Sequence, residues 1–248
     1  MKFVNLSACE DDDLCRRKHV FQASGESHCC NRLRVLFKLD YSLLNVPLTF
    51  FINHHFNLSL IEKVRAVEGM FHDLDEAIAG FQSRSTLRCQ FGCGKCCFKA
   101  DIEATVLEFL PFAQHLYQQG FADEWLEKLK ASDQEVCLIL NPTQAGTGLC
   151  TEYVHRGLIC RLFGYSARTN KYGARELVTC QVIKTEQREA YEEAQEKVRN
   201  NAESVPVMNE YYMQLHSIDP ELARDFYPIN QAIRKAIETV LHYYAYRS

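Results

Sequence analysis

The chain has 248 residues, of which 47% are hydrophobic and 24% charged, so it can bury a core and global disorder is excluded. Its formal net charge of −4 argues against a dedicated nucleic-acid binder, because such proteins usually present a strongly basic face. We therefore expect a folded protein that acts on a protein or small-molecule partner and not on nucleic acid.

The N-terminus does not read as an export signal, which needs an apolar stretch of about 7–15 residues. Here only a short segment separates Lys2 from Cys9, and an acidic run follows at residues 10–13. The most apolar stretch, residues 41–60, is interrupted by asparagine, proline and histidine, so it is a poor candidate for a membrane span of about 20 residues. We expect a cytoplasmic protein, whose thiols stay reduced.

In chain order, residues 1–57 show no sustained helical or strand period, so we expect a loosely ordered N-terminal extension there. A second unit over residues 58–248 is expected to be the cysteine-cluster domain with C-terminal helices. Its first element is predicted by apolar residues that recur at spacings of three and four from Leu60 to Ile78, which is typical of an amphipathic helix.

Further along, Asp101 is expected to cap a second helix that runs toward Gly120, with Pro111 kinking it or marking a new start. A short buried strand, a turn-rich segment and an extended piece are predicted at residues 136–140, 141–148 and 176–180. Helices are predicted at residues 122–130, 185–200 and 228–246. The fold class is thus mainly α, with an irregular cysteine-rich metal-binding core, short strands, and amphipathic helices packed around it.

The twelve cysteines are unevenly distributed. One group reads Cys89-x3-Cys93-x2-Cys96-Cys97, a spacing that lets thiolates converge from a short loop, and the loop's glycines give the backbone the freedom to turn. Further thiols follow in the segment without helical period. The candidate metal ligands are Cys89, Cys93, Cys96, Cys97, Cys150, Cys160 and Cys180.

The other cysteines and the nearby histidine receive different interpretations. Cys137 stands alone in an apolar stretch and is expected to be a core residue. His155 is expected to be a surface or packing residue. The N-terminal thiols, Cys9, Cys15, Cys29 and Cys30, are expected to be unrelated to the metal site.

The cysteine loop, joined to Arg156-Gly157-Leu158-Ile159-Cys160-Arg161-Leu162-Phe163 downstream, resembles the YkgJ-type cysteine-cluster family with its CxxCxxCC motif. The family is described as zinc- or iron-chelating, so the resemblance implies metal binding. The first spacing is three residues here and two in the family, which puts Cys89 in doubt as a ligand. Flagellin lysine methylase, a relative described as an iron–sulfur protein, adds a protein-modification enzyme to the functions that the resemblance implies.

The residues leave the metal open between zinc and an iron–sulfur cluster, of which a 4Fe–4S cluster is one form, since both take four thiolates. The number of thiols and the lack of histidine in the loop favour iron–sulfur. A radical S-adenosylmethionine enzyme shares the Cys-x3-Cys-x2-Cys spacing, but the helix-rich pattern does not suit the repeated strand–helix units of that class.

Two arginines near the distal cysteines are candidates for contact with a cofactor or an anionic substrate, because guanidinium groups bind carboxylates bidentately. They are Arg161 and Arg168, and Arg161 adjoins Cys160, where it could support the metal site. No nucleophile–base pair, phosphate-binding glycine loop or paired carboxylates stand out, so no catalytic residue is assigned. The function is expected to be a redox or protein-modification role at the metal, or alternatively a structural zinc module that acts through partners.

Overall fold

The computed structural model describes residues 58–89, 93–144 and 147–247. The predicted extension over residues 1–57, with its four cysteines, lies outside these residues and stays a prediction. The described residues belong to one compact unit that begins at Leu58. Its helices are α1 (Leu60–Ser85), α2 (Leu110–Gln119), α3 (Ala122–Ala131), α4 (Leu158–Leu162), α5 (Gln181–Glu186), α6 (Arg188–Arg199), α7 (Met208–Ile218), α8 (Pro220–Arg224) and α9 (Ile229–Ala245).

Short strands and single 3-10 turns complete the described part of the chain. The strands pair two by two and antiparallel, β1 with β6, β2 with β3, and β4 with β5. They are β1 (Glu103–Ala104), β2 (Leu140–Gln144), β3 (Thr147–Cys150), β4 (Ser166–Thr169), β5 (Arg175–Val178) and β6 (Tyr227–Pro228), and the 3-10 turns are η3 (Lys95–Phe98), η4 (Leu107–Phe109) and η5 (Tyr153–His155). The prediction of a mainly α fold with short strands is confirmed.

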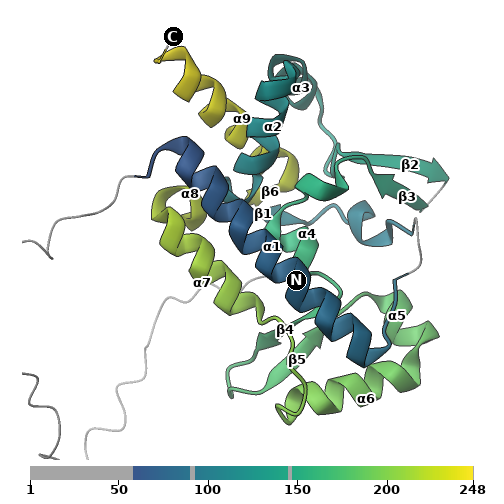
Figure 1. Cartoon of the computed structure of the whole chain (residues 1–248). Helices are drawn as coiled ribbons and strands as arrows, with labels where there is room; N and C mark the ends of the chain where they lie inside the picture. The colour runs from purple at the N-terminus through teal and green to yellow at the C-terminus, as the bar shows by residue number, and fades with distance from the viewer. Residues whose placement is uncertain (1–57, 90–92, 145–146, 248) are drawn as a thin grey trace, which may run out of the picture. The chain divides into compact units, whose positions relative to one another are not determined.

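Helix α1 runs through the middle of the unit, where it contacts α2, α4, α6 and α7 (Figure 1). It begins with a capping box, in which the Ser59 hydroxyl accepts from the Glu62 amide and the Glu62 carboxylate accepts from the Ser59 amide. One face of the helix is buried from Leu60 to Phe81. The periodicity of the sequence predicted this helix.

The second packing centre is formed by α2, α3 and α9, which lie side by side in Figure 1. Tyr244 of α9 ties it to α2: its ring stacks on Tyr117 at 4.0 Å and its hydroxyl lies 3.0 Å from the side-chain amide of Gln114. The apolar face of α9 is buried throughout from Ile229 to Val240. The predicted helices at residues 122–130 and 228–246 are confirmed.

The helix predicted to begin at Asp101 is wrong in its first part. The chain there forms the β1–β6 pair, and just beyond the two strands the Ile102 carbonyl accepts a hydrogen bond from the Ile229 amide at 2.9 Å. Helix α2 begins only at Leu110, with Pro111 in its first turn, where the missing amide hydrogen costs nothing. The backbone groups of residues 102–104, which would have bonded within a longer helix, therefore bond to the chain at the start of α9 instead.

The expected strand at residues 136–140 is also wrong, and the turn-rich segment expected at 141–148 is strand on both sides of residues 145–146, which lie outside the described residues. The Asn230 side chain of α9 accepts from the Leu138 amide and donates to the carbonyls of Gln134 and Val136, so these groups are satisfied without a neighbouring strand. The strands begin at Leu140 instead and form the β2–β3 hairpin. One asparagine side chain has replaced a strand partner.

The predicted helix at residues 185–200 is confirmed for most of its length but is divided into α5 and α6 at Gln187. The Gln187 side chain accepts from the Arg88 amide at 2.9 Å and donates to the Arg88 carbonyl. This pair of hydrogen bonds fixes the junction of α5 and α6 to the residue that precedes Cys89.

A buried carboxylate, Glu108, holds the start of α4. The side chain is fully buried, and its two oxygens accept from the Thr105 amide at 2.7 Å, the Thr105 hydroxyl at 3.1 Å and the Ile159 amide at 2.9 Å. Gly157, at the N-cap of α4, leaves room for this contact, since a Cβ there would lie 2.8 Å from Glu108 Oε2. Burial raises the pKa of Glu108 to about 7 from its ordinary 4.5, against the opposing effect of these hydrogen bonds.

This pKa predicts a specific pH dependence of stability. Between pH 4.5 and about 7 the folded chain binds the Glu108 proton more tightly than the unfolded chain, so the free energy of unfolding falls as the pH rises through that window. The slope is at most about 1.4 kcal/mol per pH unit. Urea unfolding gives the free energy of unfolding of the wild type and of Glu108→Gln at each pH in the window. The difference between the two pH dependences is the contribution of Glu108. Parallel curves for the two proteins would contradict the assignment.

Candidate metal centre

The cysteine loop is anchored at both of its described ends. Cys89 follows Arg88, whose backbone is bound by Gln187, and its side chain is exposed. Cys93 is buried, with 9% of its surface exposed. The loop then enters the η3 turn, where the Cys97 amide donates to the Gly94 carbonyl at 2.8 Å and both Cys96 and Cys97 are half-buried.

Two glycines let this loop pack directly on the β2–β3 hairpin. Gly94 has a positive φ of 56°, and a Cβ on it would overlap the carbonyl group of Gly148. A Cβ on Gly148 would in turn lie 2.8 Å from the Asn141 carbonyl oxygen of the facing strand. Only glycine suits the φ and the space at this contact, which brings the loop next to the strand that ends in Cys150.

The remaining candidate ligands come from three other elements. Cys150 ends β3, Cys160 lies in α4 behind the helix start that Glu108 binds, and Cys180 is the N-cap of α5. The Cys180 sulfur accepts from the Ile183 amide at 3.5 Å. All three are half-buried and pack against the edge of the hydrophobic core. The fold therefore gathers thiols from segments far apart in the sequence.

The electrostatics of the thiols show which of them are neighbours. Burial raises the pKa of Cys89 to about 11, and the charges of Cys93, Cys180 and Cys96 act in the same direction. Burial also raises the pKa of Cys160 well above its ordinary value, with added contributions from Cys137, Cys150 and Cys96. The charge of Cys96 thus raises the pKa values of both Cys89 and Cys160, so Cys96 lies between them.

Cys96 and Cys97 form the closest sulfur pair, 3.9 Å apart. The hydrogen bond from Cys97 lowers the pKa of Cys96 to about 7, and the Arg156 charge acts in the same direction against the effect of burial. The pKa of Cys97 is raised, first because its thiol donates that bond. The Cys96 thiol therefore ionises more readily than Cys97, Cys137, Cys150 and Cys160, whose pKa values are raised.

The donor set fits zinc or an iron–sulfur cluster. Zinc at about 2.3 Å from each sulfur of a tetrahedral site places the sulfurs about 3.8 Å apart, close to the separation of the Cys96–Cys97 pair. Among the described residues, however, no three cysteine sulfurs lie within 4.8 Å of one another, so the full set has to contract around a metal. A cation would replace the thiol protons and remove the repulsion that raises their pKa values.

Cys137 was expected to be only a core residue. It does pack against the core, but it also lies beside other thiols. The charge of Cys137 raises the pKa values of Cys97 and Cys160, and the charge of Cys150 raises the pKa of Cys137. Burial is the main reason that the pKa of Cys137 is raised, to about 11. The sequence signal that could have found it is its position between the loop and Cys150, within a segment that already holds several cysteines.

The two candidate arginines are both engaged by protein groups. Arg161 is buried, pairs with Asp75 of α1, and donates to the carbonyls of Val154 and Arg156. Its guanidinium also stacks over the Phe71 ring at 4.5 Å. Arg168 pairs with Glu176 across the β4–β5 hairpin, at 2.9 Å, and its side chain is 47% exposed. Arg161 therefore holds α4 and η5 against α1, and Arg168 faces solvent.

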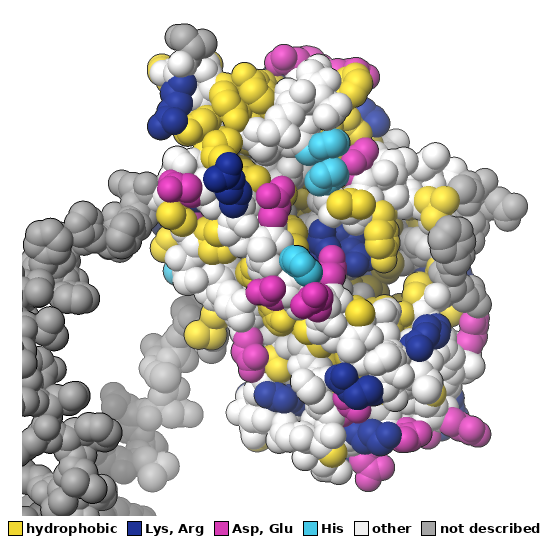
Figure 2. All heavy atoms as spheres, viewed as in Figure 1, with side chains coloured by type: hydrophobic (Ala, Val, Ile, Leu, Met, Phe, Trp, Pro, Cys, Tyr) yellow, Lys and Arg dark blue, Asp and Glu magenta, His cyan; other side chains and the backbone are white. Residues whose placement is uncertain are grey.

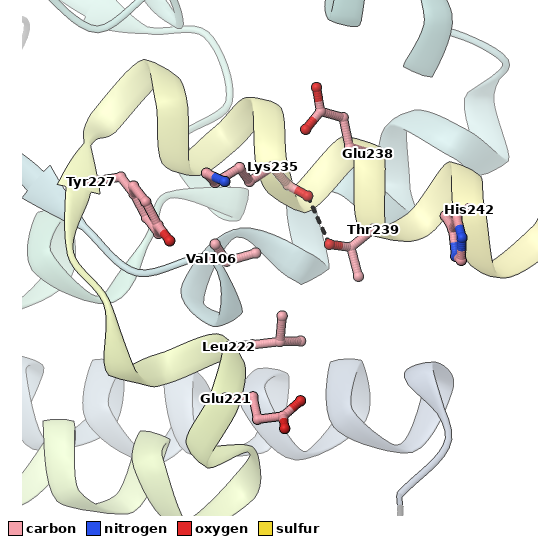
Figure 3. A pocket seen from close by; sticks show the side chains of 8 residues that line it. All are labelled: Val106, Glu221, Leu222, Tyr227, Lys235, Glu238, Thr239 and His242. Atoms are coloured by element: carbon pink, nitrogen blue, oxygen red, sulfur yellow. Dashed lines mark hydrogen bonds between the residues drawn. The ribbon is translucent and has the colours of Figure 1, made fainter.

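An open groove of about 420 Å³ lies elsewhere, between α8 and α9 (Figure 3). None of its lining residues is a cysteine, and the Thr239 hydroxyl in it donates to the Lys235 carbonyl at 2.8 Å. The groove is thus separate from the thiol-bearing elements. Its lining residues are Val106, Glu221, Leu222, Tyr227, Lys235, Glu238, Thr239 and His242.

The geometry defines a helical domain in which cysteines of separate segments lie near enough to affect one another's pKa values. Residues 88–196 match the CxxCxxCC family, which is described as a "putative zinc- or iron-chelating domain". The match covers less than half of the chain, and it confirms the resemblance predicted from the cysteine pattern. No curated protein and no solved structure gives a significant match. Of the described helices, none combines the length and the apolar character that crossing a membrane requires.

The contact between Gly94 and Gly148 predicts that Gly94→Ala displaces the cysteine loop. The substitution adds the left-handed strain of about 1–2 kcal/mol and a steric overlap with the hairpin. We expect a lower melting temperature and, with chelator present, faster alkylation of the buried Cys93 thiol, measured by peptide mass spectrometry.

Gly120→Ala is the matched control. Gly120 also has a positive φ, of 78°, but a Cβ there would meet no atom within 4 Å. Its variant carries the strain without the overlap, so alkylation of Cys93 should not change. Equal alkylation rates in the two variants would show that the loop does not depend on this packing.

Proposed function

We propose that residues 88–196 bind zinc or iron through the clustered cysteines and that this metal centre is the working part of the protein. The observation that carries the proposal is the assembly of thiols from the loop, β3, α4 and α5 into one neighbourhood. The proposed ligands are drawn from the seven predicted cysteines, with Cys137 added as an eighth thiol. The family description supports the same chemistry.

We further propose that the metal is bound as an iron–sulfur cluster. The support is the number of neighbouring thiols, which exceeds the four that a single structural zinc ion takes. The second candidate is a structural zinc site that holds these segments together and leaves the function to partners. Both need reduced thiolates, so the proposal also implies a reducing compartment such as the cytoplasm.

A redox or protein-modification role is the activity proposed for the cluster form, with a protein or small-molecule substrate. The surplus of thiols over four ligands supports it. In this role Arg161 acts as a positioning residue for α4 and Cys160, because its guanidinium contacts Asp75 and two backbone carbonyls. Arg168, exposed and paired with Glu176, is the proposed contact for an anionic partner.

Metal and sulfide analysis after anaerobic purification tests the identity of the metal. An iron–sulfur cluster predicts iron with an equal amount of acid-labile sulfide and a coloured protein. A colourless protein that contains only zinc would overturn the iron–sulfur form and favour the structural zinc module.

Single Cys→Ser variants test the ligand set. Replacement of Cys93, Cys96 or Cys160 is expected to lower the metal content and to destabilise residues 136–183, because ligand binding and folding are coupled. Cys137→Ser tests the eighth thiol: a loss of metal equal to that of Cys160→Ser makes it a ligand, and unchanged metal content makes it a packing residue.

Cys89→Ser is the comparison variant, because Cys89 is exposed and the spacing between Cys89 and Cys93 is the one that differs from the family motif. Each variant is compared for metal content per chain and for its unfolding midpoint. Unchanged metal content in all five variants would overturn the assignment of the centre to these cysteines.

A further inference from the structure

A group of non-cysteine side chains meets where α2 packs against the turn that precedes α4. His115 comes from α2, and Glu152 and His155 come from the residues around η5. Their potential ligand atoms all lie within 4.8 Å of one another, and this is the one such trio of His, Cys, Asp or Glu among the described residues. Figure 2 shows histidine side chains gathered beside an acidic one on the face that it presents.

We propose that His115, Glu152 and His155 form a second metal site, which binds a divalent transition ion such as Zn²⁺ through two imidazole nitrogens and one carboxylate oxygen. This donor set differs in kind from the thiolates, and imidazole with carboxylate suits borderline ions such as zinc and ferrous iron. The inference goes beyond the thiolate centre and does not rest on it.

The distances of the trio suit such an ion. Zinc bonded at about 2.0–2.1 Å in a tetrahedral site places neighbouring ligand atoms about 3.3 Å apart. His155 Nδ1 and Glu152 Oε2 are already 3.3 Å apart. The rings of His115 and His155 are stacked with their centroids 4.1 Å apart, so the rings have to rotate before both nitrogens point at one ion, but the ligand atoms already lie within 4.8 Å of one another.

The backbone around His155 is fixed, which gives the site a defined shape. Arg161, itself buried against α1, donates to the carbonyls of Val154 and Arg156, the residues on either side of His155. Phe112, one turn before His115 on α2, lies beside the His155 ring at 6.3 Å. A buried guanidinium and a core aromatic thus hold the two histidines at the same place.

The site is also accessible enough to exchange an ion and a ligand. The side chains of His155 and Glu152 are 25% and 29% exposed. Three protein ligands leave one tetrahedral position open, as in catalytic zinc sites and unlike closed structural ones. Water or a small anionic ligand would take that position.

Zinc protection of histidines tests the site without reference to any activity. The full-length protein is treated with diethyl pyrocarbonate, with zinc or with chelator, and the modification of each histidine is read by peptide mass spectrometry. We expect zinc to slow the modification of His115 and His155 and to leave His72 unaffected. His72 is the matched control because it also lies beside a glutamate, Glu76, at 3.9 Å, but on an exposed helix face. Equal modification of His115 and His155 with and without zinc would overturn the proposal.

Zinc binding by variants separates this site from the thiolates. His115→Ala and Glu152→Gln are each expected to weaken zinc binding at one site at least about tenfold and to abolish protection of His155. His72→Ala should bind as the wild type does.

Cys160→Ser should lose metal at the thiolate centre and keep the protection of both histidines. Loss of protection in Cys160→Ser but full protection in His115→Ala would assign the effect to the thiolates and refute the second site. If a variant does not fold, the protection measured on the wild type decides.

Discussion

The buried carboxylate of Glu108 is the contact on which the arrangement around the candidate metal centre depends. By accepting the Ile159 amide it binds the first turn of a helix of only five residues, which has little stability of its own. That helix carries Cys160 and Arg161, and Arg161 then fixes the turn that carries His155. A single buried acceptor therefore positions a thiol and, through the arginine, an imidazole.

The second constraint is electrostatic. Thiols brought together at the edge of a hydrophobic core are costly to ionise, and the raised pKa values of Cys137 and Cys160 reflect that cost. A protein gains nothing in packing from such crowding that alanine or valine would not provide. A bound cation would stabilise the thiolates and so remove the free-energy cost of ionising neighbouring, partly buried thiols. The same reasoning distinguishes Cys137 from an isolated core cysteine, since its neighbours are other thiols.

Much of this fold was predictable from local patterns, and the failures have identifiable causes. Helices α1, α3 and α9 have strong apolar periodicity, which secondary structure follows closely. The strand expected at residues 136–140 failed because a side chain from residue 230 satisfies its backbone, a contact that no local pattern contains. The cysteine loop could be recognised from its spacing. The trio of His115, Glu152 and His155 could not, because His115 lies 37 residues (152 − 115) before Glu152 in the sequence. Of the trio, only the Glu-x-x-His spacing of Glu152 and His155 is visible in the local sequence.

The hydrogen bonds between Gln187 and Arg88 join residues 99 positions apart, and they have a consequence for the order of folding. Contacts of such long range form late, because closing a large loop costs chain entropy before any contact repays it. On the ribosome, the first thiol of the domain emerges long before Cys180 and Gln187 are synthesised. The thiols of residues 89–97 therefore stay accessible to solvent until the rest of the domain has been synthesised. During that time they can be oxidised or can bind an unintended metal ion.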